Sequence, residues 1–119
     1  MLVRAGIVAS LSLAASAAQA QTPVASVQYS CAEGKSLTAA YFDGPTRAAP
    51  DGRPIPGGRV VLTFADGKKL DLPQTLSGSG IRYANQGESF VFWSKGDTAF
   101  VEEGSNQTAT YKDCVGRKR

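Results

Sequence analysis

The chain contains 119 residues, with 13 lysines and arginines, 10 aspartates and glutamates, no histidine and a formal net charge of +3. Without histidine it cannot use Ser-His-Asp or Cys-His nucleophilic catalysis, and it lacks the imidazole ligand of the usual zinc sites. The positive surplus is small and forms no basic stripe with interleaved aromatic residues, so we expect no nucleic-acid partner.

Residues 1–20 have the pattern of a secretory signal peptide. Arg4 supplies a positive charge, an apolar run follows, and the small residues Ala18 and Ala20 fit a signal-peptidase site. The apolar run is too short to cross a bilayer comfortably, and no cysteine near the cleavage point could carry a lipid. We therefore expect an exported protein without a stable membrane anchor, whose single domain covers residues 21–119.

Two cysteines, Cys31 and Cys114, lie near opposite ends of this domain. We expect them to form a disulfide, because an exported protein folds in an oxidising compartment. A domain this small buries only about 60–65% of its unfolded surface, so a covalent link matters to its stability. Closing a loop of about eighty residues contributes roughly 4–5 kcal/mol in the chain-entropy model.

Alternating apolar and polar residues predict a first strand over residues 24–32 and a second over residues 37–42, joined by a turn at Gly34. Residues 43–58 hold four prolines and four glycines and show no apolar periodicity. We expect this segment to be a long loop without regular structure.

The rest of the chain alternates short apolar runs with turn residues. Asp66-Gly67 is a strong two-residue hairpin signal. Residues 73–79 are expected to form a polar connection, and residues 117–119 a frayed terminus. The predicted strands cover residues 59–64, 68–72, 80–84, 88–94, 98–102 and 107–114. Seven or eight such strands predict an all-β sandwich or small barrel, and the short links favour up-and-down connections.

Lys95 is the first candidate binding residue. It follows one of the most apolar predicted strands and precedes Gly96, which permits a tight turn with positive φ. Its ammonium group would project from a rigid platform and lose little freedom on binding a partner. A solvated lysine in an ordinary hairpin would show the same pattern.

Ser77 and Ser79 alternate with glycines in the connection that precedes residues 80–84. Such a segment lets another molecule approach closely and offers it hydroxyl groups. A flexible connection would have the same composition. Tyr83 follows in the next strand, where it must face the side opposite to its neighbour Arg82.

The aromatic neighbours Phe92 and Trp93 must also face opposite sides of their strand. We expect Phe92 to lie inside, and Trp93 either to cover the barrel or to flank Lys95. A core position for Trp93 remains an alternative.

The acidic residues do not suggest catalysis. Glu102 and Glu103 are adjacent in a predicted strand, so they face opposite ways and cannot flank one glycosidic bond. Asp43, Asp51 and Asp66 precede glycines and are best interpreted as turn formers. No calcium-loop spacing is present. We therefore expect no enzyme activity, no metal and no cofactor.

Taken together, four motifs resemble those of the periplasmic and membrane-bound inhibitors of c-type lysozyme. They are Tyr29-x-Cys31-x-x-Gly34 with the following strand, Ser79-Gly80-x-x-Tyr83, Phe92-Trp93-x-Lys95-Gly96-x-x-Ala99, and the closing Cys114. The similarity covers nearly all of residues 21–119 except the proline-rich segment. It implies an eight-stranded antiparallel β-barrel with one disulfide.

The resemblance also implies that Ser79 and Lys95 enter the active-site cleft of a c-type lysozyme and so protect peptidoglycan. Ser77 is an alternative contacting hydroxyl, and Tyr83, Trp93 and Gly96 are expected as neighbours or supports. A periplasmic module that binds peptidoglycan or another envelope component through the same surface is the alternative function. The oligomeric state, monomer or dimer, stays open.

Overall fold

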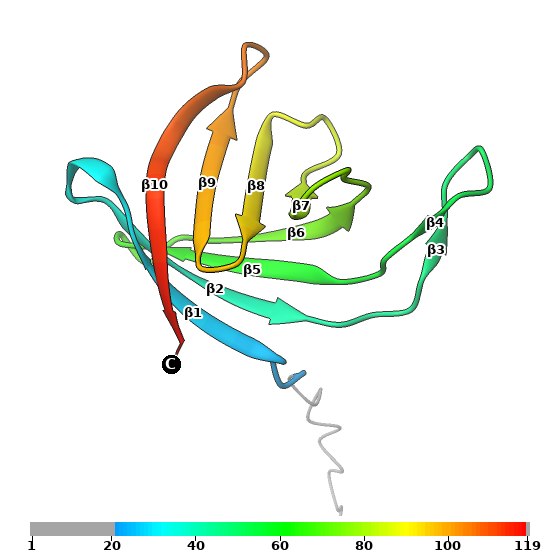
Figure 1. Ribbon diagram of the computed structural model, residues 1–119, viewed down its shortest axis with the longest axis horizontal. Coiled ribbons are helices and arrows are strands. Elements are labelled where there is room, and N and C mark those ends of the chain that lie inside the picture. The colour runs from blue at the N-terminus through cyan, green and yellow to red at the C-terminus, as the bar shows by residue number, and fades with distance from the viewer. Residues whose placement is uncertain (1–20, 119) are drawn as a thin grey trace, which may run out of the picture.

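The computed structural model describes residues 21–118, and the predicted signal peptide lies outside the described residues. Eight strands form a closed barrel (Figure 1). They are β1 (Ala25–Ser30), β2 (Ser36–Phe42), β5 (Arg59–Phe64), β6 (Lys69–Thr75), β7 (Ile81–Ala84), β8 (Phe90–Lys95), β9 (Thr98–Glu103) and β10 (Thr108–Lys118). A short 3-10 turn, η1 (Ala32–Gly34), links β1 to β2.

Each barrel strand pairs antiparallel with the next barrel strand along the chain, and β1 pairs with β10 to close the barrel. The predicted all-β fold with up-and-down connections is thus confirmed, as is the eight-stranded barrel implied by the resemblance. Closure pairs the first and last strands with each other and leaves neither as a free sheet edge.

The expectation that residues 43–58 lack regular structure was wrong. They contain a two-stranded hairpin of β3 (Arg47–Ala48) and β4 (Pro54–Ile55), which extends away from the barrel (Figure 1). At its neck, a side chain on Gly44 would collide with the backbone of Gly57. The hairpin has only two residue pairs, whose side chains are exposed or half-buried, so it leaves no periodic signal in the sequence.

The boundary of β6 also differs from the prediction, because the strand continues through Pro73 to Thr75. The N–H of Gln74 donates to the carbonyl of Gly58 at 2.8 Å. Alternate residues direct their N–H groups to opposite neighbours, so the ring nitrogen of Pro73 faces β7. The pairing of β6 with β7 starts only at Gln74, and the proline therefore costs no ladder hydrogen bond.

Strand β10 is longer than predicted and includes Arg117 and Lys118, which were expected to fray. Its first half pairs with β9, and its second half pairs with β1 up to the pair Val27 and Lys118. The strand needs this length because closure requires it to bridge both neighbours.

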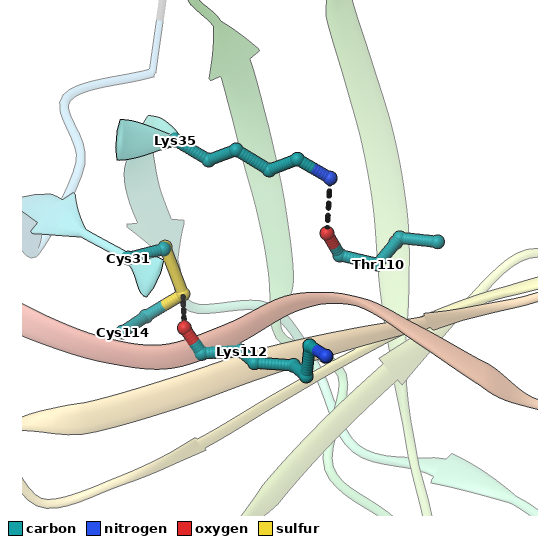
Figure 2. Close-up of a disulfide and its surroundings, with 5 residues drawn as sticks. All are labelled: Cys31, Lys35, Thr110, Lys112 and Cys114. Carbon is teal, nitrogen blue, oxygen red and sulfur yellow. Dashed lines mark hydrogen bonds between the residues drawn. A yellow bond between two sulfur atoms is a disulfide. The ribbon is translucent and has the colours of Figure 1, made fainter. Parts of the chain in front are cut away.

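The predicted disulfide between Cys31 and Cys114 is present and spans a sequence separation of 83 (Figure 2). It joins the end of β1 to the buried middle of β10. A second link lies beside it, because the Lys35 ammonium group donates to the carbonyl of Thr110 at 2.7 Å (Figure 2). The same group lies 5.1 Å from the centre of the Tyr111 ring.

The barrel interior is filled by apolar and aromatic side chains. Phe92 is fully buried and packs edge-on against Tyr29, with ring centres 5.9 Å apart. The hydroxyls of Tyr29 and Tyr41 lie 2.6 Å apart and share a hydrogen bond. Burial raises the pKa of Tyr29 above its ordinary value, and the hydrogen bond with Tyr41 raises it further. Burial also raises the pKa of Tyr83.

The part of the chain that the structure describes contains no helix of the length and apolarity needed to span a membrane. Within residues 21–118, no three potential metal-ligating side chains come together.

We predict that removing the disulfide destabilises the barrel by about 2–5 kcal/mol, because the unfolded chain regains the freedom that the cross-link removes. The double variant Cys31→Ala/Cys114→Ala should show a lower melting temperature by circular dichroism, and so should the unchanged protein under reducing conditions. The double variant is the control for the reductant, which should not alter its melt. An equal melting temperature for the variant and the unchanged protein would contradict the prediction.

We predict that stability falls as the pH rises above about 10. Below that pH the buried tyrosines are neutral in both states. Above it the tyrosines of the unfolded chain lose their protons before those of the folded chain. The free energy of unfolding then falls by up to about 1.4 kcal/mol per pH unit for each tyrosine with a raised pKa. Urea unfolding between pH 8 and 11.5 measures this loss. Tyr83→Phe should make the decline shallower, since Tyr83 is 4% exposed. An unchanged slope would contradict the assignment.

Candidate functional site

The β8–β9 hairpin holds Lys95 at one end of the barrel. Alternation along β8 directs Phe92 and Ser94 inward, where they are 0% and 7% exposed, and leaves Lys95 exposed on the outer side. The following Gly96 adopts the expected positive φ, 57°. The hydroxyl of Thr98 donates to the Lys95 carbonyl at 2.9 Å and closes the turn. The lysine therefore extends from a backbone that is fixed on both sides.

The register between β7 and β8 brings Ser79 to this lysine. Ile81 pairs with Ser94, so the residues just before β7 run beside the end of β8. The Lys95 ammonium group donates to the Ser79 hydroxyl at 3.1 Å, and both side chains are exposed. Two candidates that are 16 residues apart in the sequence thus form one polar pair.

Ser77 has a different position in the same loop. Its hydroxyl donates to the Ser79 carbonyl at 2.7 Å and accepts from the Ser79 N–H at 3.2 Å. It is partly buried, whereas Ser79 is exposed. The hydroxyl that lies beside the lysine is therefore that of Ser79.

Beside the polar pair is a pocket of about 240 Å³, lined by Ser79, Lys95, Trp93, Thr98 and Phe100 among others. Trp93 and Phe100 are cross-strand partners on β8 and β9, and their rings stack with centres 5.8 Å apart at 18°. An ammonium group and a hydroxyl thus stand at the rim of a largely apolar hollow.

Trp93 lies on the outer surface, partly buried, and not in the core. The Arg82 guanidinium lies 5.6 Å from the centre of its ring, and the indole N–H donates to Glu102 at 3.2 Å. Arg82 in turn donates to Glu88 at 3.0 Å. These contacts fix the orientation of Trp93, as expected for a residue that flanks Lys95.

Tyr83 is not brought to the surface with the other candidates. It is 4% exposed, and its ring packs against those of Tyr41 and Phe92, with ring centres 5.9 and 6.2 Å away. From this position it can support the site only through the interior of the barrel.

Sequence reasoning missed Phe100 and Glu102 as parts of this site. Phe100 is 39% exposed and forms one wall of the pocket, and Glu102 holds the indole of Trp93. Both alternate along β9 on the outer face. The register of β8 and β9, which their short turn could have suggested, would have placed Phe100 opposite Trp93 and Glu102 opposite Val91, on the same outer face.

The electrostatics of the pair favour an anionic partner. Among the described residues, no carboxylate lies within ion-pair distance of Lys95. One of its three N–H donors is directed to Ser79, and the other two are available. The Ser79 hydroxyl accepts from the lysine and still has its own proton to donate. The two groups can therefore bind one carboxylate together.

Comparisons with known proteins find similar sequences over part of the chain. Residues 54–110 match the family described as "Membrane-bound lysozyme-inhibitor of c-type lysozyme". A "Membrane-bound lysozyme inhibitor of C-type lysozyme" from Yersinia enterocolitica is 45% identical over 54 residues, 45% of this chain and 43% of that protein. A protein of the same name from Cupriavidus necator is 32% identical over 80 residues, 67% of this chain and 54% of that protein. The chain thus spans about half the length of these relatives.

A solved structure is similar in fold. It is the crystal structure of PliC-St, the periplasmic lysozyme inhibitor of C-type lysozyme from Salmonella typhimurium, with a TM-score of 0.50 and 17% identity. The alignment covers 76% of this chain and 93% of that one. The resemblance to the inhibitors of c-type lysozyme is therefore confirmed, and the matched segment, residues 54–110, contains both Ser79 and Lys95.

Proposed function

We propose that this protein is a periplasmic inhibitor of c-type lysozyme that protects peptidoglycan, and that residues 21–119 act after the signal peptide is removed. The observation that carries the proposal is the exposed hydrogen bond between Lys95 and Ser79 at the rim of an apolar pocket. The similarity of the surrounding segment to proteins named as inhibitors of this enzyme supports the same conclusion.

Lysozyme hydrolyses its substrate with two carboxyl groups that flank the scissile bond. An ammonium group is the natural complement of such a cleft, and the serine hydroxyl adds a donor to the same carboxylate. Lys95 is the main anchor in this proposal and Ser79 the second contact. Occupation of the cleft excludes the glycan, so the inhibition is competitive and non-covalent and requires no reaction on this chain.

The net affinity of Lys95 for a carboxylate depends on how rigid the site is before binding. Removing a lysine from water costs free energy that the ion pair must offset, so a buried charge pair is not automatically favourable. Here the turn at Gly96 and the Ser79 hydroxyl already hold Lys95 before binding. Less side-chain freedom is lost on association, which leaves more of the electrostatic gain. Trp93 and Gly96 act as supports at the surface, and Tyr83 acts from the interior.

A module that binds peptidoglycan is the second candidate. Only the rings of Trp93 and Phe100 at the pocket favour it, because aromatic side chains offer apolar surface to a sugar. Co-sedimentation with purified peptidoglycan in the absence of lysozyme would support this candidate.

We predict that the purified protein slows a c-type lysozyme acting on cell-wall substrate, and that excess substrate relieves the inhibition. Lys95→Ala should weaken inhibition about 30-fold, equivalent to about 2 kcal/mol for a buried anchor. An unchanged rate at micromolar concentrations of the protein would reject the proposed function.

Lys68→Ala is the matched control for Lys95→Ala. It removes the same charge from an exposed side chain next to the start of β6, whereas the Ser79 loop follows the end of that strand. Its inhibition constant should stay within about twofold of the unchanged protein, because surface ion pairs such as Lys68 with Asp66 contribute little. Equal losses in the two variants would indicate a general charge effect and reject Lys95 as the anchor.

A further inference from the structure

We infer that Ser77 and Gly80 are positioning residues, which hold the Ser79 hydroxyl against the Lys95 ammonium group before any partner binds. Ser77 acts only through the main chain of Ser79 and does not contact the partner. The inference rests on the proposed function, in which Ser79 and Lys95 are the contacting pair.

The hydroxyl of Ser77 already serves its own loop. It donates its proton to the Ser79 carbonyl at 2.7 Å and accepts the Ser79 N–H at 3.2 Å. A hydroxyl has one proton, so Ser77 has none left to offer a carboxylate. The two bonds hold the amide groups on both sides of the Ser79 α-carbon, and this fixes the direction of its side chain.

Gly80 fixes the same loop from the other side. It has a φ of 70°, a conformation that L-residues rarely adopt. A Cβ at this position would lie 2.9 Å from the Ser94 carbonyl oxygen and 3.3 Å from the Lys95 Cβ. The loop can therefore lie against the end of β8 only because residue 80 has no side chain.

The neighbouring glycines do not share this constraint. A Cβ on Gly78 would meet nothing within 4 Å, and Gly78 has no positive φ. Gly104 has a φ of 81°, and a Cβ on it would also meet nothing within 4 Å. It follows the last residue of β9, whereas Lys95 lies near the first residue of that strand. An alanine at Gly80 could act through lost flexibility, through backbone strain, or by displacing the loop from Lys95. Alanine at Gly78 tests the loss of flexibility alone, and alanine at Gly104 tests the backbone strain alone.

We predict that Ser77→Ala weakens lysozyme inhibition about fivefold, and that it causes no further loss in a Ser79→Ala background. Ser77→Thr should retain inhibition within about twofold, because it keeps the hydroxyl. Inhibition constants of the two single variants and the double variant form a double-mutant cycle. Additive losses would show that Ser77 contacts the partner itself, and full inhibition by Ser77→Ala would show that it positions nothing. Either result overturns the inference.

A measurement without lysozyme separates this inference from the proposed function. Ser77→Ala removes the acceptor of the Ser79 N–H, so the amide hydrogen of Ser79 should exchange about fivefold faster by NMR. If the unchanged protein does not inhibit lysozyme, the proposed function fails, while the exchange rate still decides whether Ser77 holds the loop. An exchange rate equal to that of the unchanged protein rejects the role of Ser77.

We predict that Gly80→Ala weakens inhibition at least tenfold, while Gly78→Ala and Gly104→Ala stay within about twofold of the unchanged protein. Gly104→Ala introduces the same kind of left-handed strain, so similar melting temperatures for it and Gly80→Ala would assign the difference in inhibition to the loop. If Gly80→Ala inhibits as well as Gly104→Ala, Gly80 does not position the pair. If Gly80→Ala does not fold, the Ser77 cycle alone decides the inference.

Discussion

The pairing of β1 with β10 is the constraint on which the rest of the structure depends. It turns a linear series of hairpins into a closed wall, and the disulfide between Cys31 and Cys114 fixes it covalently. The hydrogen bond from Lys35, which follows the η1 turn, to the carbonyl of Thr110 reinforces the same junction (Figure 2). Closure gives every barrel strand two fixed neighbours, and for a domain this small it creates an interior that can bury Phe92, Tyr29 and Tyr83.

The register between neighbouring strands explains how Ser79 and Lys95 meet at the site. The register of β7 on β8 is set by inward-facing side chains, because a slip of one residue would turn every one of them outward. That register carries the serine loop to the end of β8, where Lys95 begins the next turn. The same strand register thus both buries the apolar side chains and brings Ser79 to Lys95. The outer row of Arg82, Trp93 and Phe100 follows from the same pairings.

Most of the barrel could be predicted from the sequence because its strands bury one face and so alternate in polarity. Residues 59–64 match β5 without any shift, and the turn glycines mark most of the connections. The β3–β4 hairpin could not be predicted, since its strands are two residues long and largely exposed. Strand β6 accommodates Pro73 because of its register, and Phe100 faces Trp93 for the same reason. Ser77 bonds the backbone of its own loop. Polarity patterns along a sequence contain neither register nor loop hydrogen bonds. Lys95 and Ser79 could be named as candidates from the sequence, but the hydrogen bond between them depends on the register of β7 on β8.

The β3–β4 hairpin has a consequence for how this fold can vary. It connects β2 to β5 and extends from the barrel where Gly44 and Gly57 lie close together (Figure 1). Strands β2 and β5 pair directly with each other, without any contribution from the hairpin. The entropic cost of a surface connection rises only with the logarithm of its length. Natural sequences can therefore lengthen, shorten or rewrite this appendage while the wall beneath it stays intact. Evolutionary divergence should concentrate there, in contrast to the loop before β7, where the Ser77 hydroxyl bonds the Ser79 backbone and Gly80 lies against the end of β8.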